Sequence, residues 1–175
     1  MKVMTALRSA ALVLGLAALA PISTTALADS VKGHAGTTWS LAPIPGHPNQ
    51  FTHTVDGLVR VSSLGNCTFH ADVIVTFPTV AGQPLLLDGT FHITTADGST
   101  TLDAHAQGTG TPDPANANML NFHYDIRFAG GTGQMANARG TGGVDGFAMF
   151  RTEDSGIATW LLQANISTRG HGHDN

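Results

Sequence analysis

The chain has 175 residues, of which 42% are hydrophobic and 11% charged, and its formal net charge at pH 7 is −4. A chain of this length is expected to form one domain that buries on the order of 70% of its unfolded surface. Nucleic acids and anionic membranes recruit patches of Lys and Arg, so the acidic balance argues against both as partners.

The first 28 residues have the pattern of a secretory signal peptide. Lys2 and Arg8 come first, residues 10–20 are apolar, and Ala-Leu-Ala at residues 26–28 supplies small side chains for cleavage. The apolar run is shorter than the roughly 20 residues of a membrane-spanning helix, which argues against a membrane span. We therefore predict cleavage near Ala28 and export to the periplasm or the exterior.

Residues 29–50 contain several glycines and prolines but few large apolar side chains. They are predicted to form an extended N-terminal arm. A short strand at residues 39–41 is an alternative for that part of the arm. Residues 51–168 form the predicted β-barrel domain. Residues 169–175 are predicted to be a disordered tail.

Alternation of apolar and polar residues predicts strands throughout the barrel domain. The predicted strands occupy residues 52–63, 67–77, 85–96, 100–109, 120–128, 139–150 and 157–167. Between them, residues 108–118 contain Thr-Pro-Asp-Pro and are predicted to form a long surface loop at one barrel mouth.

Asp97-Gly98 lies between two alternating segments and predicts a type I′ hairpin turn, in which both central residues need positive φ. The resulting register places His92 opposite Asp103 on the polar face. On the other face it pairs Phe91 with Ala104 and Ile93 with Leu102, so apolar residues meet apolar residues across both strands.

The chain is organised around residues 121–146, where a strand, a glycine-rich corner, a turn of small residues and a second strand follow one another. Its strand alternates strictly and ends at the glycine-rich segment 130–133, which predicts a sharp corner or bulge. Residues 134–138 are compatible with about one helical turn. No Lys-Ser/Thr pair follows the glycines, so a phosphate-binding loop is the less favoured interpretation.

Seven or eight turn-punctuated strands without a helix signal predict an all-β fold, a closed antiparallel barrel of about eight strands. A two-sheet β-sandwich is the alternative.

The segment FAGGTGQMANARGTGGVDG at residues 128–146 resembles the G-G-T-G-x-F-A-x-A-x-G-x-G segment of secreted bacterial proteins related to allene oxide cyclase and dirigent proteins. The likeness extends to residues 88–110 and, more weakly, to residues 62–77, so it covers most of residues 57–167. Met135 departs from the pattern, which usually has an aromatic residue there. The resemblance implies an eight-stranded antiparallel barrel more strongly than it implies a cyclase, and no catalytic residue is transferred.

Histidine and cysteine carry no recognisable metal or catalytic motif. The four strand histidines fall on the polar faces and are predicted to lie on a solvated outer surface; they are His70, His92, His105 and His123. No zinc spacing and no G-x-S-x-G motif occurs, so neither a metal nor a cofactor is predicted. The C-terminal His171, His173 and Asp174 could hold a metal, but disorder is the simpler interpretation. Cys67 is predicted to be a buried thiol, with an intermolecular disulfide as the alternative.

The apolar faces provide the candidate ligand-binding residues. Tyr124 is the only tyrosine, and its hydroxyl needs a partner in the barrel interior or at a ligand. The predicted ligand-binding set is Tyr124, Phe122, Phe91, Phe69 and Trp160. The inward alanines, among them Ala104, favour a cavity over a filled interior.

The sequence therefore predicts a secreted barrel that binds a small apolar molecule, aromatic or polyenoic, without assigned catalysis. The alternative is a cofactor-free cyclase or isomerase, or a dirigent-like guide of stereochemistry, acting on such a molecule. Homo-oligomer formation is left open.

Overall fold

Inward and outward side chains alternate along the strands of residues 29–168, the part of the chain that this computed structural model describes. This alternation makes long strands that are buried on one face only. The elements are β1 (Asp29–Pro43), β2 (Gln50–Val61), β3 (Gly65–Thr76), β4 (Leu85–Thr95), β5 (Thr101–Asp113), β6 (Asn116–Gly131), the 3₁₀ helix η1 (Gly133–Met135), β7 (Arg139–Phe150) and β8 (Ser155–Ser167).

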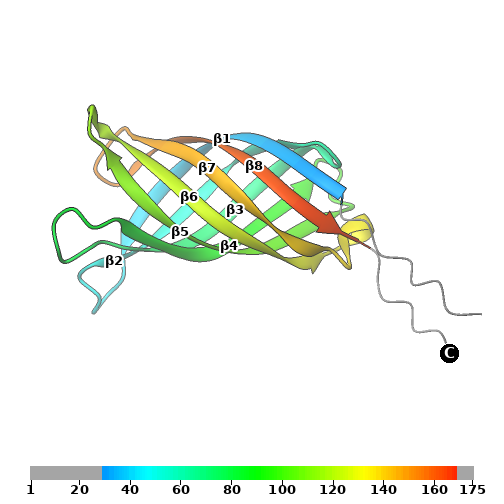
Figure 1. Ribbon diagram of the computed structural model, residues 1–175, viewed down its shortest axis with the longest axis horizontal. Coiled ribbons are helices and arrows are strands. Elements are labelled where there is room, and N and C mark those ends of the chain that lie inside the picture. Colours follow the sequence, from blue (N-terminus) through cyan, green and yellow to red (C-terminus); the bar gives the residue numbers. More distant parts are fainter. Residues whose placement is uncertain (1–28, 169–175) are drawn as a thin grey trace, which may run out of the picture.

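Each strand pairs antiparallel with the next one along the chain, and β8 pairs with β1 to close the barrel. The predicted all-β closed barrel of eight strands is thus confirmed, and the sandwich alternative is wrong. The connections β2–β3, β4–β5 and β6–β7 lie at the end that carries η1, which we call the plugged end (Figure 1). The other four connections lie at the opposite end, which we call the open end.

The N-terminal segment belongs to the barrel and is not an arm outside it. β1 pairs with both β2 and β8, so the barrel begins at Asp29 and not at residue 51. Its inward face consists largely of small residues, which is why the sequence shows little apolar signal. A Cβ on Gly33 would lie 3.4 Å from the Cβ of Leu162, so β8 already fills the space beside it.

The predicted loop at residues 108–118 is also wrong, because β5 and β6 run through most of it. Only two residues separate the strands, and the Asp113 carboxylate accepts hydrogen bonds from the backbone N–H groups of Ala115 (2.8 Å) and Asn116 (3.1 Å). Gly108 is a close-approach glycine within a strand: a Cβ there would lie 2.0 Å from the carbonyl oxygen of His123.

The β4–β5 hairpin has the predicted register but not the predicted turn. His92 is opposite Asp103, as the alternation indicated. Gly98 has a φ of 71°, whereas none of the described non-glycine residues has positive φ, so the turn is not type I′. The Asp97 carboxylate instead holds the loop, accepting hydrogen bonds from the hydroxyl of Thr95 (2.7 Å) and the backbone N–H of Ser99 (3.1 Å).

The glycine-rich corner after β6 forms as predicted and closes one end of the barrel. Gly130 and Gly133 have φ values of 117° and 56°, in the region that favours glycine. The single turn of η1 follows, and Met135 and Ala138 are buried against the core. In the part of the chain that the structure describes, no helix is long and apolar enough to cross a membrane.

The half of the interior next to η1 is filled by side chains. Leu102, Ile166 and Val31 are almost completely buried there, and the void beside Ala104 measures only about 10 Å³. Cys67 is buried as a free thiol, as predicted, and burial raises its pKa. The small side chain of Ala104 therefore makes room for its large neighbours, and the expectation that it opens a cavity is wrong.

Replacing Leu102 with alanine should lower the free energy of unfolding by about 2 to 5 kcal/mol, because the side chain is 1% exposed in a filled core. Leu58→Ala is the control, since Leu58 is 70% exposed on the outer face and should change stability by less than about 0.5 kcal/mol. Urea unfolding monitored by tryptophan fluorescence measures both. Equal losses in the two variants would contradict the assigned inward face.

Candidate functional site

An apolar cavity of about 60 Å³ lies inside the barrel towards the open end. Every strand except β5 contributes to its wall. Leu41, Phe77, Leu120 and Phe150 surround its outer part and are only partly buried, which identifies this part as the mouth. The cavity exceeds the roughly 10 to 15 Å³ that one water needs, but it is smaller than the roughly 300 to 1,000 Å³ of pockets that enclose a drug-sized ligand.

The structure brings all five predicted ligand-binding residues to the wall of this cavity. They are Tyr124, Phe122, Phe91, Phe69 and Trp160. Their rings form a chain of edge-to-face contacts with centroid separations between 4.8 and 5.7 Å. Such contacts hold aromatic rings in defined orientations, so the cavity has a rigid aromatic wall. Binding of a ligand by these residues stays a prediction.

Two polar side chains of the wall are already hydrogen bonded within the barrel. The indole N–H of Trp39 donates to the carbonyl oxygen of Ile157 (3.1 Å). The hydroxyl of Thr37 donates to the carbonyl oxygen of Ala158 (3.3 Å). Both bonds cross from β1 to β8, so these groups stabilise barrel closure and are not free to bind a ligand.

Tyr124 and His53 are the polar wall residues without such bonds. Tyr124 is 5% exposed, its hydroxyl has no hydrogen-bond partner in the described part of the chain, and burial raises its pKa. The Nδ1 atom of His53 is buried and likewise has no partner among the described residues. Burial lowers the pKa of His53 to about 4, so the imidazole is neutral near pH 7.

His53 was not identified as a candidate from the sequence. It shares its inward face with Val55, Val59 and Val61 of β2, so the period of two along this strand could have revealed it. Its ring packs edge-on against Trp39 with a centroid separation of 5.5 Å. The cavity therefore combines an aromatic wall with two neutral polar groups.

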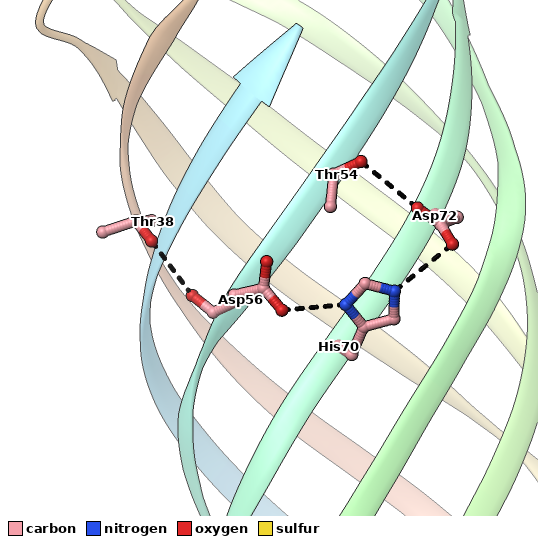
Figure 2. A network of polar contacts seen from close by, with 5 residues as sticks. All are labelled: Thr38, Thr54, Asp56, His70 and Asp72. Atoms are coloured by element: carbon pink, nitrogen blue, oxygen red, sulfur yellow. Dashed lines mark hydrogen bonds and ion pairs between the residues drawn. The ribbon is translucent and has the colours of Figure 1, made fainter.

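The outer surface carries a different arrangement, in which histidines pair with aspartates across neighbouring strands. Figure 2 shows His70 between two carboxylates, with Nδ1 2.8 Å from Asp56 and Nε2 3.2 Å from Asp72. The Thr54 hydroxyl donates to the Asp72 carboxylate (3.2 Å), and the Thr38 hydroxyl donates to the backbone carbonyl of Asp56 (3.4 Å). This network joins β1, β2 and β3 on the outside of the barrel.

The other three strand histidines are paired in the same way. His92 contacts Asp103, His105 lies 3.0 Å from Asp88, and His123 lies 2.7 Å from Asp145 and 3.5 Å from Asp125. All four histidine side chains are about half exposed. The predicted solvated outer surface is thus confirmed. Within residues 29–168 no group of three or more His, Cys, Asp or Glu side chains is placed to hold a metal ion. The predicted tail with His171 and His173 lies outside the described residues.

The paired carboxylates raise the pKa of His70, chiefly through the hydrogen bond with Asp56, and raise that of His123, chiefly through the hydrogen bond with Asp145. A histidine whose pKa is raised by folding stabilises the folded state below its unfolded pKa of 6.5. That contribution disappears as the pH rises through the higher folded pKa.

We therefore expect the free energy of unfolding to fall as the pH rises above the unfolded pKa of 6.5, and Asp56→Asn to make this fall shallower. Because the pair is exposed, the difference should not exceed about 1 kcal/mol. Urea unfolding at several pH values measures it. His34→Gln is the control, since His34 is exposed and forms no ion pair with the described residues. A wild-type slope retained in Asp56→Asn would contradict the role of this pair.

A scan against protein-family models found no match, and searches of curated proteins and of solved structures found no similar protein. The function of this chain is therefore inferred from its cavity and its sequence pattern.

Proposed function

We propose that this protein binds a small apolar molecule in the cavity at the open end of its barrel. The observation that supports this most directly is the aromatic wall, to which β3, β4, β6 and β8 each contribute at least one ring. A ligand in such a cavity removes apolar surface from contact with water, and this favours binding by about 25 cal/mol per Å² of apolar area. Part of that gain is offset by the lost freedom of the ligand.

The volume of the cavity limits which apolar molecules fit. A space of about 60 Å³ accommodates only part of an aromatic or polyenoic molecule. A larger ligand would extend through the mouth, where Leu41 and Phe77 contribute further apolar surface. The rigid inner wall would then hold one end of the ligand while the mouth covers the rest.

We also propose export, on the basis of the N-terminal sequence. Residues 1–28 lie outside the described residues, and the support is their charged start, apolar run and Ala-Leu-Ala ending. Membership of the allene oxide cyclase and dirigent group remains a proposal that rests on the glycine-rich segment at residues 128–146.

A cofactor-free cyclase or isomerase, or a dirigent-like guide of coupling, is the second candidate function. The observation that favours it is the presence of two neutral polar groups, His53 and Tyr124, in an otherwise apolar cavity. Such groups could steer developing charge while the walls fold a substrate. Binding requires only the apolar wall, whereas catalysis also requires the two polar groups to act on a substrate. Binding without catalysis is therefore the function that we place first.

Adding a phenyl ring to the cavity wall should weaken the binding of a neutral fluorescent probe such as N-phenyl-1-naphthylamine. Ala158 lines the cavity, so Ala158→Phe should weaken probe binding at least about tenfold, a difference of about 1.4 kcal/mol. The neighbouring Thr159 points outward on the same strand, and Thr159→Phe should bind the probe as the wild type does.

Fluorescence titration of the three proteins measures these affinities, and urea unfolding shows whether each variant is folded. If Ala158→Phe does not fold, the smaller Ala148→Leu takes its place, since Ala148 also lines the cavity. Equal affinity of wild type, Thr159→Phe and a folded cavity variant would exclude the interior as the binding site.

A further inference from the structure

This inference rests on the proposed function, the binding of a small apolar molecule in the cavity. The few polar groups of the cavity wall then indicate which functional group such a molecule carries. The wall contains no Asp, Glu, Lys or Arg side chain in the described part of the chain. Its hydrogen-bonding groups are those of Thr37, Trp39, His53 and Tyr124, and the first two are bonded to the backbone of β8. Only His53 and Tyr124 remain to recognise a ligand.

We propose that the ligand is a neutral molecule with a hydroxyl group, an alcohol or a phenol, and that this hydroxyl hydrogen bonds to the imidazole of His53. A neutral imidazole has one nitrogen that donates and one that accepts. A hydroxyl group both donates and accepts, so it pairs with either nitrogen in either tautomer. It can also accept a hydrogen bond from the Tyr124 hydroxyl or donate one to it.

The surroundings of His53 explain why the protein itself does not supply the partner. In the β2 register His53 lies opposite Leu41 of β1 and Val73 of β3, and both of these residues line the cavity. The ring of Trp39 packs edge-to-face against the imidazole, and the indole N–H already donates to the carbonyl oxygen of Ile157. No side chain among these neighbours is free to satisfy the ring.

A buried polar atom without a partner destabilises a folded protein, so its retention calls for an explanation. Here the unpaired nitrogen belongs to a residue of the cavity wall that lies opposite Leu41 of the mouth. An ordered water is the competing explanation, and it predicts no preference between a hydroxylated ligand and its methyl ether.

Charged ligands fit this cavity poorly. A carboxylate or an ammonium group would lose its hydration without meeting an opposite charge. Burial keeps His53 neutral at pH values well above 4, so the imidazole does not provide a cation for a carboxylate. The inferred ligand is therefore neutral as well as hydroxylated.

Three matched ligands test this inference: 4-propylphenol, its O-methyl ether 4-propylanisole, and 4-propylbenzoate. Their affinities are measured by calorimetry at pH 7, with displacement of N-phenyl-1-naphthylamine as a second readout. For the wild type we expect the phenol to bind at least about tenfold more tightly than either the ether or the benzoate, a difference of about 1.4 kcal/mol.

Variants of the two polar residues identify which one carries the preference. His53→Leu should reduce the advantage of the phenol over the ether to less than about twofold, a difference below about 0.4 kcal/mol, without weakening the ether. His53→Gln should restore part of that advantage. His34→Leu changes an exposed outer-face histidine and should behave as the wild type. Because the unpaired nitrogen destabilises the protein, His53→Leu should also unfold at a higher temperature than the wild type when no ligand is present.

Each outcome distinguishes this inference from the proposed function. If phenol and ether bind the wild type equally, or if the benzoate binds most tightly, the inference is wrong and cavity binding stands. If Tyr124→Phe removes the preference for the phenol and His53→Leu leaves it intact, the role assigned to His53 is wrong. If none of the ligands and no probe binds, the proposed function itself fails.

Discussion

Closure of the sheet between β1 and β8 is the constraint on which the rest of the structure depends. Twelve residue pairs join these strands, from Asp29 with Ile166 to Ser40 with Ser155. Without them the remaining strands would form an open sheet with two unpaired edges and an exposed apolar face. The side-chain hydrogen bonds of Thr37 and Trp39 cross the same seam, so the residues that close the barrel also form part of the cavity wall.

An eight-stranded barrel has an interior that side chains either fill or leave partly open. This barrel does both along its length. At the plugged end, η1 and the surrounding aliphatic side chains leave almost no space. Towards the open end, aromatic rings in edge-to-face contact and aliphatic side chains together surround the cavity. The free space inside the barrel therefore lies towards the open end.

The outer face raises the pKa of two histidine side chains, His70 and His123, whereas the inner face lowers that of His53. On the outer face the four paired histidines are half exposed beside carboxylates. For His70 and His123, these carboxylates raise the pKa and so favour the charged ring. On the inner face, His53 is partly exposed, but its Nδ1 atom is buried, and desolvation lowers its pKa and so favours the neutral ring. As the pH falls from neutral, His70 and His123 therefore become charged on the surface before His53 becomes charged in the cavity wall.

The sequence by itself determined the strands whose inward residues are large, because the alternation of Phe69 to Val75 or of Ala158 to Ile166 allows only one buried face. It also determined the corner after β6, where glycine alone adopts the observed φ values comfortably. Only the tertiary structure showed that β1 completes the barrel. Its small inward residues give little apolar signal in the sequence, and they fit the barrel because large side chains of β8 fill the space beside them. The candidate site divides in the same way: periodicity predicted the aromatic wall, but the missing partner of His53 depends on which atoms three separate strands bring to it, and no local pattern encodes that.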